Sequence, residues 1–300
     1  RDTVFPTGEV GKRPFKIEGD RAYGPGVADM KSGLVINSFV LAAFQKFVGA
    51  PAPLVALYTG DEEIASPSSR PIIENAAREA RLVFNSEPGR PTGNVVTGRK
   101  GGVFMRCEVE GVAAHSGGNY EMGRSAIEEL ARKIQAWHQL TDLEAGVTVN
   151  IGLIEGGQSV NTVAPHAKAE IDLRYVRMPQ RDEAVAAIRE IAETCSVPDT
   201  SATLTILGEF NALSQTPEAK ALFDHYVAAA GEAGLKVSGE FTGGCADSGF
   251  TAAVGTPTIC ATGPVGGNAH SPDEYLEVNS IVPRAQAMAI AIGGSDELLG

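Results

Sequence analysis

The sequence has few cysteines and few basic residues, and each shortage argues against a class of protein. Its four cysteines form no Cys-x-x-Cys pair, which argues against a thiolate zinc finger and a dense disulfide framework. We expect four buried free thiols, at Cys107, Cys195, Cys245 and Cys260. The 25 basic residues are outnumbered by 37 acidic ones, for a net charge of -12. Such a chain should repel nucleic acid and anionic membrane surfaces.

Other patterns are also missing from the sequence. No apolar run approaches the ~20 residues needed to span a bilayer, so we expect no membrane partner. No Gly-x-Ser-x-Gly elbow occurs, which disfavours a serine hydrolase. The segment Gly24-Pro-Gly26 lacks the full dinucleotide-binding fingerprint. With free thiols and no readable targeting segment, the cytoplasm is the expected compartment.

The pattern of apolar residues in the first hundred positions predicts an α/β fold. With 300 residues and 43% hydrophobic content, the chain can bury the core of one or two domains. We predict, in order, a helix at 30–48, a strand at 52–58, a helix at 69–80 and a strand at 81–86. This alternation is typical of a parallel-rich mixed sheet.

The middle of the chain follows a different order of elements. Residues 102–110 alternate like a half-buried strand, and they begin a strand, helix, strand, strand, helix, strand series. The later elements of the series are predicted at 124–139, 148–154, 167–176, 179–195 and 202–207. This order is that of an α+β, ferredoxin-like unit.

The α/β pattern then resumes, with a helix at 217–233, a strand at 256–261 and a helix at 279–292. We therefore predict a catalytic domain in two parts, 1–99 and 211–300. The ferredoxin-like domain, 100–210, is inserted between them.

Acidic residues and one histidine recur just after short apolar runs, where strands should end. They are Asp2, Asp29, Glu62, Glu63, Glu87 and His270. Carboxylates and imidazole gathered at strand ends are what a hydrolytic zinc site needs. Simpler interpretations exist for each residue: Asp29 could cap the following helix, the Glu-Glu pair could be an exposed turn, and His270 could be a surface histidine.

The motifs around these residues resemble those of the co-catalytic zinc peptidases of the aminoacylase and carboxypeptidase group. In order, they are Asp-Thr-Val-x-Pro, Gly-x-x-Asp-Met-Lys-x-Gly, Asp-Glu-Glu and Ala-His-Ser-Pro-Asp-Glu. The resemblance covers essentially the whole chain. It is greatest to bacterial glutamate carboxypeptidases that cleave folates.

The resemblance implies two zinc ions and a role for each motif residue. Asp29 matches the bridging carboxylate, Glu63 and His270 match ligands of one zinc, and Glu87 matches a ligand of the other. Glu62 matches the general base. Asp2 matches the carboxylate that orients a first histidine ligand.

That first histidine is expected immediately before Arg1. We therefore expect these 300 residues to be N-terminally incomplete.

The resemblance also assigns roles within the inserted domain. His115, in Gly-Val-Ala-Ala-His-Ser-Gly, matches a lid histidine that stabilises the oxyanion in the partner subunit, so a homodimer joined through residues 100–210 is expected. Asn161 and Arg174 match residues that hold the substrate. An arginine such as Arg174 suits the α-carboxylate of the substrate, to which it can donate two hydrogen bonds. From the residues alone, Arg174 is better interpreted as a strand cation paired with Asp172 or Glu170.

One further segment, Gly243-Gly-Cys-Ala-Asp247, resembles a Gly-Gly-x-x-Asp loop that lines the family's site. Cys245 stands where a small hydroxyl residue is expected.

The function implied is a dizinc carboxypeptidase that acts on a small peptide or acyl-amino-acid and releases a C-terminal amino acid, with glutamate expected. Two alternatives remain open. One is an N-acyl-amino-acid deacylase or another amidohydrolase of the same family. The other is a catalytically incomplete, dimerising fragment that lacks one metal ligand.

Overall fold

The computed structural model describes residues 2–49 and 53–298. The chain divides into two compact units, the first formed by Arg1–Arg99 with Leu213–Gly300 and the second by Lys100–Ala212. The divisions predicted from the sequence are 99/100 and 210/211, whereas these units meet at 99/100 and 212/213. A role of the second unit as a lid or a dimerisation domain stays a prediction.

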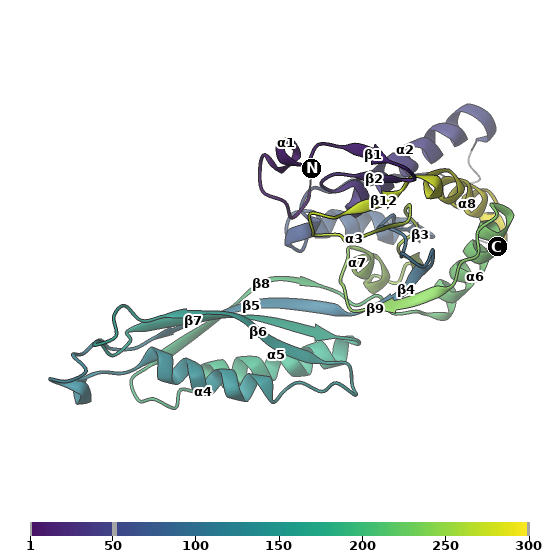
Figure 1. Ribbon diagram of the computed structural model, residues 1–300. Coiled ribbons are helices and arrows are strands. Elements are labelled where there is room, and N and C mark those ends of the chain that lie inside the picture. The colour runs from purple at the N-terminus through teal and green to yellow at the C-terminus, as the bar shows by residue number, and fades with distance from the viewer. Residues whose placement is uncertain (1, 50–52, 299–300) are drawn as a thin grey trace. The chain divides into compact units, whose positions relative to one another are not determined.

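The second unit has the element order and the sheet order of a ferredoxin-like fold. Its elements are β5 (Gly101–Glu110), α4 (Ala126–His138), β6 (Thr148–Gly156), β7 (His166–Tyr175), α5 (Met178–Glu193) and β8 (Ser201–Phe210). The strands pair in the order β6-β7-β5-β8, and every pair is antiparallel. Both helices cover the same face of this sheet (Figure 1). The predicted strand-helix-strand-strand-helix-strand order is therefore the observed one.

The core of this unit follows from the alternation along β5. Val103, Met105, Cys107 and Val109 are fully buried, because successive side chains of a strand point to opposite faces. Trp137 of α4 packs into the same core, and its indole N–H donates to the Ile188 carbonyl oxygen of α5 at 3.1 Å. The helix face and the strand face thus form one apolar layer.

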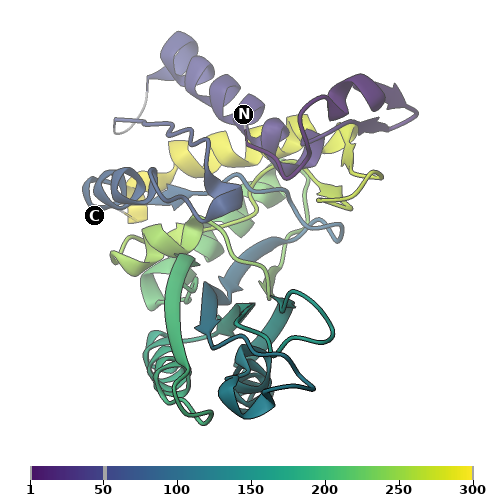
Figure 2. The same ribbon diagram turned by 90° about the vertical axis from the view of Figure 1, so that its left-hand side faces the viewer.

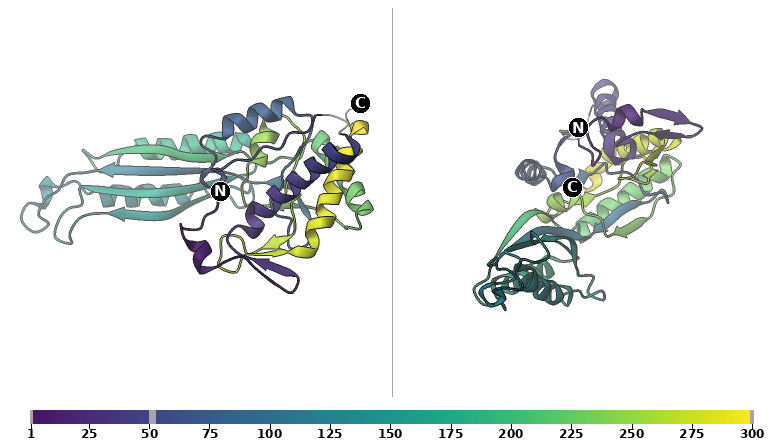
Figure 3. Two further views of the ribbon diagram at one scale, coloured as in Figure 1. Left: turned by 90° about the horizontal axis from the view of Figure 1, so that it is seen from above. Right: turned by 60° about the vertical axis from the view of Figure 1, so that its left-hand side comes forward.

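In the first unit, α8 (Ile281–Gly293) packs against other helices. Those in contact with it are α2 (Ser32–Ala43) and α6 (Pro217–Glu232), while α3 (Arg70–Glu79) packs against α7 (Ser248–Ala253) and the short α1 (Glu9–Lys12) lies near the N-terminus. On α2, Ile36 and Val40 are buried against Met288 of α8, and the two helices lie side by side in Figures 2 and 3. On its other side, α8 contributes Ala287 to a cluster with Tyr226 of α6.

One helical stretch in the described ranges, Val27–Phe47, is long and apolar enough to cross a membrane, judged by length and composition alone. It runs through α2, through the segment Val27–Lys31 before it, in which Asp29 and Met30 are not helical, and into the π-helical turn Phe44–Val48. Ile36, Val40 and Phe44 of this stretch are buried in the first unit. Val35, Phe39 and Phe47 of the same stretch are exposed, so it packs through one face only, as a helix at the surface of a globular unit does.

The sheets of the first unit are smaller and more divided than the predicted parallel-rich sheet. β10 (Thr258–Ile259) pairs in parallel with β3 (Val83–Phe84), and β4 (Val95–Arg99) pairs in parallel with β9 (Gly239–Thr242). A third sheet is antiparallel, in the order β1-β2-β12-β11. Its strands are β1 (Lys16–Glu18), β2 (Arg21–Tyr23), β11 (Gly266–Gly267) and β12 (Tyr275–Glu277). The fold is mixed α/β with several sheets, only some of them parallel.

The strand predicted at 52–58 is not a strand in the structure. Residue 52 lies outside the described residues, and residues 53–59 have no regular secondary structure. Their exposure alternates as in a strand, with Val55 82% exposed and Leu54 packed against the cluster that contains Ile36. The apolar pattern is present, but no strand of the described chain pairs with it, and a strand is defined by such pairing.

The cysteines are all free, as expected, but only two are buried. Cys107 and Cys260 lie in the cores, whereas Cys195 and Cys245 are partly exposed. The prediction of four buried thiols was therefore wrong for these two, which lie in segments after α5 and before α7 rather than inside a helix or strand.

Candidate metal centre

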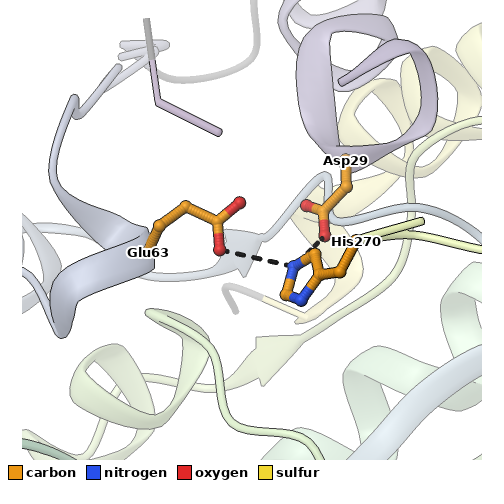
Figure 4. A group of neighbouring side chains, drawn as sticks. All are labelled: Asp29, Glu63 and His270. Carbon is orange, nitrogen blue, oxygen red and sulfur yellow. Dashed lines mark ion pairs between the residues drawn. The ribbon is translucent and has the colours of Figure 1, made fainter. Parts of the chain in front are cut away.

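Three of the predicted ligands meet in the first unit, each from a different irregular segment. Asp29 lies in the segment Val27–Lys31 before α2, where its own backbone is not helical. Glu63 lies in the 3-10 turn Glu62–Ile64, and His270 lies in the link between β11 and β12. The His270 Nε2 atom is 3.3 Å from Asp29 Oδ2 and 3.4 Å from Glu63 Oε2 (Figure 4). One ligand atom of each residue lies within 4.8 Å of those of the other two.

This arrangement fits a zinc ion both in chemistry and in spacing. Zinc takes imidazole nitrogen and carboxylate oxygen, and ligands about 2.0–2.2 Å from a tetrahedral ion lie about 3.3–3.6 Å from one another. The two distances from His270 Nε2 fall in that range. The three side chains could therefore hold one zinc ion between them.

The segment that carries Glu62 and Glu63 is fixed by carboxylates around it. Asp2 Oδ2 accepts the backbone N–H of Glu63 at 2.9 Å. Asp61 Oδ2 accepts the backbone N–H groups of Ser68 and Ser69 at 2.8 and 3.1 Å. Asp2 thus positions the backbone of a predicted ligand, a contact that the sequence did not suggest.

A second contact to the same segment comes from the Gly243–Asp247 loop. Asp247 Oδ1 accepts the hydroxyl hydrogen of fully buried Ser66 at 2.6 Å. The pKa of Asp247 is raised to about 6, because the effect of burial exceeds the opposite effect of this hydrogen bond. The loop that the sequence placed at the site therefore touches the Glu62–Glu63 segment.

The charges of the neighbouring acids affect the pKa values of Glu62 and Glu87. Neither residue belongs to the three-residue cluster of Asp29, Glu63 and His270. Burial, together with the negative charges of Glu87, Asp247, Glu63 and Asp29, raises the pKa of Glu62 to about 10. Burial and the charge of Asp29 raise the pKa of Glu87 to about 8. So many carboxylates in one buried place favour protonation unless a cation balances them.

The cluster itself shows the same effect. Burial is the main cause that raises the pKa of both Asp29 and Glu63, and the charge of Asp2 adds to it in each case. A divalent cation would reverse this effect, because it favours the ionised carboxylates that bind it.

Arg99, at the end of β4, is a buried cation near these acids. Its Nε donates to Cys260 Sγ at 3.2 Å, and one Nη donates to the carbonyl oxygens of Gly244 and Cys245 at 3.1 and 3.3 Å. Its charge lowers the pKa of both Asp29 and Glu87. Arg99 therefore supplies part of the positive charge around the acids and holds the Gly243–Asp247 loop.

The lid residue predicted for oxyanion stabilisation lies in the second unit, in a turn before α4. His115 is exposed, and its Nδ1 accepts the backbone N–H groups of Gly117 and Gly118, both at 3.1 Å. A neutral imidazole with Nδ1 as acceptor carries its proton on Nε2. The turn therefore presents His115 Nε2–H as a hydrogen-bond donor.

Asn161 lies beside this turn. Its backbone carbonyl oxygen accepts the N–H of Ser116 at 3.0 Å, and its Oδ1 accepts from the Ser159 hydroxyl at 3.0 Å. The structure therefore brings two of the predicted residues of the second unit, His115 and Asn161, into neighbouring segments.

Arg174 forms the ion pair that the simpler interpretation anticipated. On β7, its Nε and one Nη donate to the two carboxylate oxygens of Asp172 at 2.7 and 3.0 Å. The guanidinium also lies over the ring of Phe104, 5.2 Å from the ring centre. A substrate-binding role for Arg174 stays a prediction.

Sequence reasoning assigned no role to Glu274, although it lies in the Ala-His-Ser-Pro-Asp-Glu motif. Its side chain is fully buried and accepts the backbone N–H of Asp29 at 2.9 Å. The signal was its place four residues after a predicted ligand. Arg99 and Ser66 were also missed, because nothing in their local sequence marks them.

Comparison with known proteins places the chain among metal-dependent peptidases. The sequence pattern that describes Peptidase family M20/M25/M40 matches residues 1–293. Carboxypeptidase G2 of a Pseudomonas species is 30% identical over 293 residues, which cover 96% of this chain and 70% of the relative. Succinyl-diaminopimelate desuccinylase of Burkholderia multivorans is 27% identical over 281 residues, 88% of this chain and 72% of the relative.

The solved structures agree on the fold. An M20 family metallo-carboxypeptidase from Sulfolobus solfataricus superposes with a TM-score of 0.74 at 18% identity. The superposition covers 96% of this chain and 82% of that one.

Proposed function

The chain belongs to Peptidase family M20/M25/M40, and from this membership we propose that it acts as a zinc carboxypeptidase that hydrolyses a C-terminal amide bond and releases glutamate. The observation that carries the proposal is the meeting of Asp29, Glu63 and His270 at zinc-ligand spacing. The likeness to Carboxypeptidase G2 supports the carboxypeptidase activity.

In this proposal Asp29, Glu63 and His270 hold one zinc ion. Zinc, when bound, supplies Lewis-acid polarisation of the scissile carbonyl and positive charge in the site. Asp29 and Glu87 would be among the residues that hold a second zinc ion. The buried carboxylates around Asp29 support the binding of divalent cations, whose positive charge balances theirs.

Glu62 is the general base of the proposed reaction. It takes a proton from the attacking water and delivers it to the leaving nitrogen as the C–N bond breaks. Its raised pKa, about 10 without a cation, means that it is protonated at neutral pH in the empty site. Positive charge in the site lowers that pKa, so Glu62 becomes a base when the site is loaded.

The second unit contributes substrate binding and oxyanion stabilisation. The fork of Arg174, preorganised by Asp172, suits the α-carboxylate of the released amino acid. Asn161 provides a side-chain amide beside the His115 turn. We propose a homodimer joined through residues 100–210, in which Nε2–H of His115 donates to the oxyanion formed in a second copy.

A second candidate is an N-acyl-amino-acid amidohydrolase. The likeness to a succinyl-diaminopimelate desuccinylase favours it, because the same metal and base would cleave either amide. The two candidates differ in which side of the scissile bond is recognised.

A substrate panel tests the proposal. The complete protein, loaded with Zn²⁺, is compared on N-acyl-glutamates and folate, on N-acetyl amino acids, and on N-succinyl-diaminopimelate, with release of the free amine as the readout. We expect kcat/KM to be highest for the glutamate amides, and kcat of the Glu62→Gln protein to be strongly reduced on all of them. The highest kcat/KM on N-succinyl-diaminopimelate would instead establish the second candidate.

A further inference from the structure

Glu274 lies at the end of the link that carries His270. This link, residues 268–274, joins β11 to β12, and Glu274 is fully buried at its end. Its backbone N–H donates to the Ser271 carbonyl oxygen at 3.3 Å, and the Ser271 hydroxyl donates to the Asn268 carbonyl oxygen at 2.8 Å. The link is therefore a compact, internally bonded turn with His270 on it.

The carboxylate of Glu274 accepts three backbone N–H groups from the segment that carries Asp29. Oε2 accepts from Gly26 at 2.7 Å, and Oε1 accepts from Ala28 and from Asp29, both at 2.9 Å. All three contacts need an acceptor, which both oxygens of an ionised carboxylate provide. An amide at this position could accept with one atom only.

Close packing leaves the Asp29 segment little room to move by another route. Gly26 has φ +71°, and an added Cβ there would lie 2.7 Å from Thr3 Cγ2. An added Cβ at Gly266 of β11 would lie 2.4 Å from Ala28 Cβ. The segment 26–29 and the β11–β12 hairpin are thus in close contact, and the Glu274 carboxylate accepts the hydrogen bonds that the segment donates.

We infer that Glu274 is a positioning residue that holds the backbone of Asp29 in place before a metal arrives and ties it to the turn that carries His270. The two residues whose ligand atoms lie 3.3 Å apart come from opposite ends of the chain, and Glu274 bonds directly to both segments. The effect of Glu274 on metal binding rests on the proposed zinc site. Its role in holding the backbone of residues 26–29 does not depend on that site.

Hydrogen–deuterium exchange of the metal-free protein, compared between Glu274→Gln and wild type, tests the holding role. The variant keeps the shape of the side chain but loses one acceptor. We expect the amides of residues 24–30 to exchange about tenfold faster or more in it, because hydrogen bonds to a charged group are lost. Glu277→Gln, a change of the partly exposed partner of Arg21 on the same hairpin, is the matched control and should exchange as wild type does.

Glu274→Asp keeps the experiment decisive if Glu274→Gln fails to fold. Aspartate retains both acceptors but reaches less far, so exchange of residues 24–30 should lie between wild type and the expected glutamine result. Wild-type exchange in these residues, in either folded Glu274 variant, would overturn the inference.

Titration with Co²⁺, followed by its visible absorption, measures the consequence for metal. Glu274→Gln should raise the Co²⁺ dissociation constant about tenfold or more, while KM of the loaded protein for an acyl-glutamate stays unchanged. Faster exchange with wild-type Co²⁺ affinity would overturn the link to metal binding. A wild-type protein that binds no Co²⁺ would contradict the proposed function alone, since the exchange comparison is made without metal.

Discussion

The imidazole of His270 lies 3.3 Å from the carboxylate of Asp29. The first residue follows β11 near the end of the chain, and the second precedes α2 near its beginning. Neither is in a regular strand or a long helix, so their meeting depends on the loops that carry them. The chemistry proposed for this chain depends on that meeting.

The stability of the metal-free protein should decrease as the pH rises. Burial and neighbouring charges raise the pKa of Glu87 to about 8 and that of Glu62 to about 10, from 4.5. Between about pH 5 and pH 8 the native state binds protons that the unfolded chain has released, so the free energy of unfolding falls with rising pH. Thermal melts after chelation should show a falling Tm across this range.

The control for this prediction is Glu87→Gln, whose neutral amide does not titrate. Its Tm should depend less on pH than that of wild type, and Zn²⁺ added to wild type at pH 8 should raise Tm by binding the native state. A metal-free Tm that rises from pH 5 to pH 8 would contradict the role given to these buried acids.

The neighbouring residues Glu62 and Glu63 should have separable roles. Glu62→Gln should lower kcat ~10²–10⁴-fold, as expected for loss of a general base, and retain zinc. Glu63→Gln should instead lose zinc, because Glu63 is in the cluster with Asp29 and His270. Elemental analysis beside steady-state kinetics separates the two, and the reverse pattern would exchange their assignments.

Arg174 should act on substrate affinity rather than on the chemical step. Arg174→Lys removes the planar fork but keeps the charge, and we expect KM for an acyl-glutamate to rise about 10- to 100-fold with kcat little changed. Arg106→Lys, a change of another arginine on the same sheet that pairs with Glu170, is the matched control. An unchanged KM for Arg174→Lys would contradict substrate binding by Arg174 and leave only its ion pair with Asp172.

Two inactive variants test whether catalysis needs two copies of the chain. His115→Ala should lower kcat about 10²–10³-fold, the usual cost of losing an oxyanion donor, and Glu62→Gln should be nearly inactive. Mixed and allowed to exchange subunits, they should form heterodimers with one intact composite site and regain part of the activity. If exchange is proven and no activity returns, His115 acts within its own copy or outside catalysis.

Helices and strands whose apolar residues repeat regularly were predictable, because the repeat marks the side chains that form the core. The alternation of Val103, Met105, Cys107 and Val109 indicated β5, and all four are buried as it required. The same reasoning at Leu54 and Val55 predicted a strand that the structure does not form. Periodicity reports which side chains could be buried, whereas a strand also needs a neighbour for its backbone.

The residues that could bind metal were predictable from the sequence. Asp29, Glu63 and His270 were proposed from their positions after apolar runs and from their motifs, and the structure brings them together. The contacts that hold them were not predictable. Glu274 acts on the backbone of Asp29, and no local pattern links two segments so distant in sequence.

The most direct test of the account is the metal content of the complete protein, measured together with that of His270→Ala. After loading with Zn²⁺ and removal of excess ion, elemental analysis should give about two zinc ions per wild-type chain. His270→Ala should lose zinc, and its hydrolysis of an acyl-glutamate should fall with it. Equal zinc in both proteins, or no zinc in wild type, would contradict a metal centre built on Asp29, Glu63 and His270.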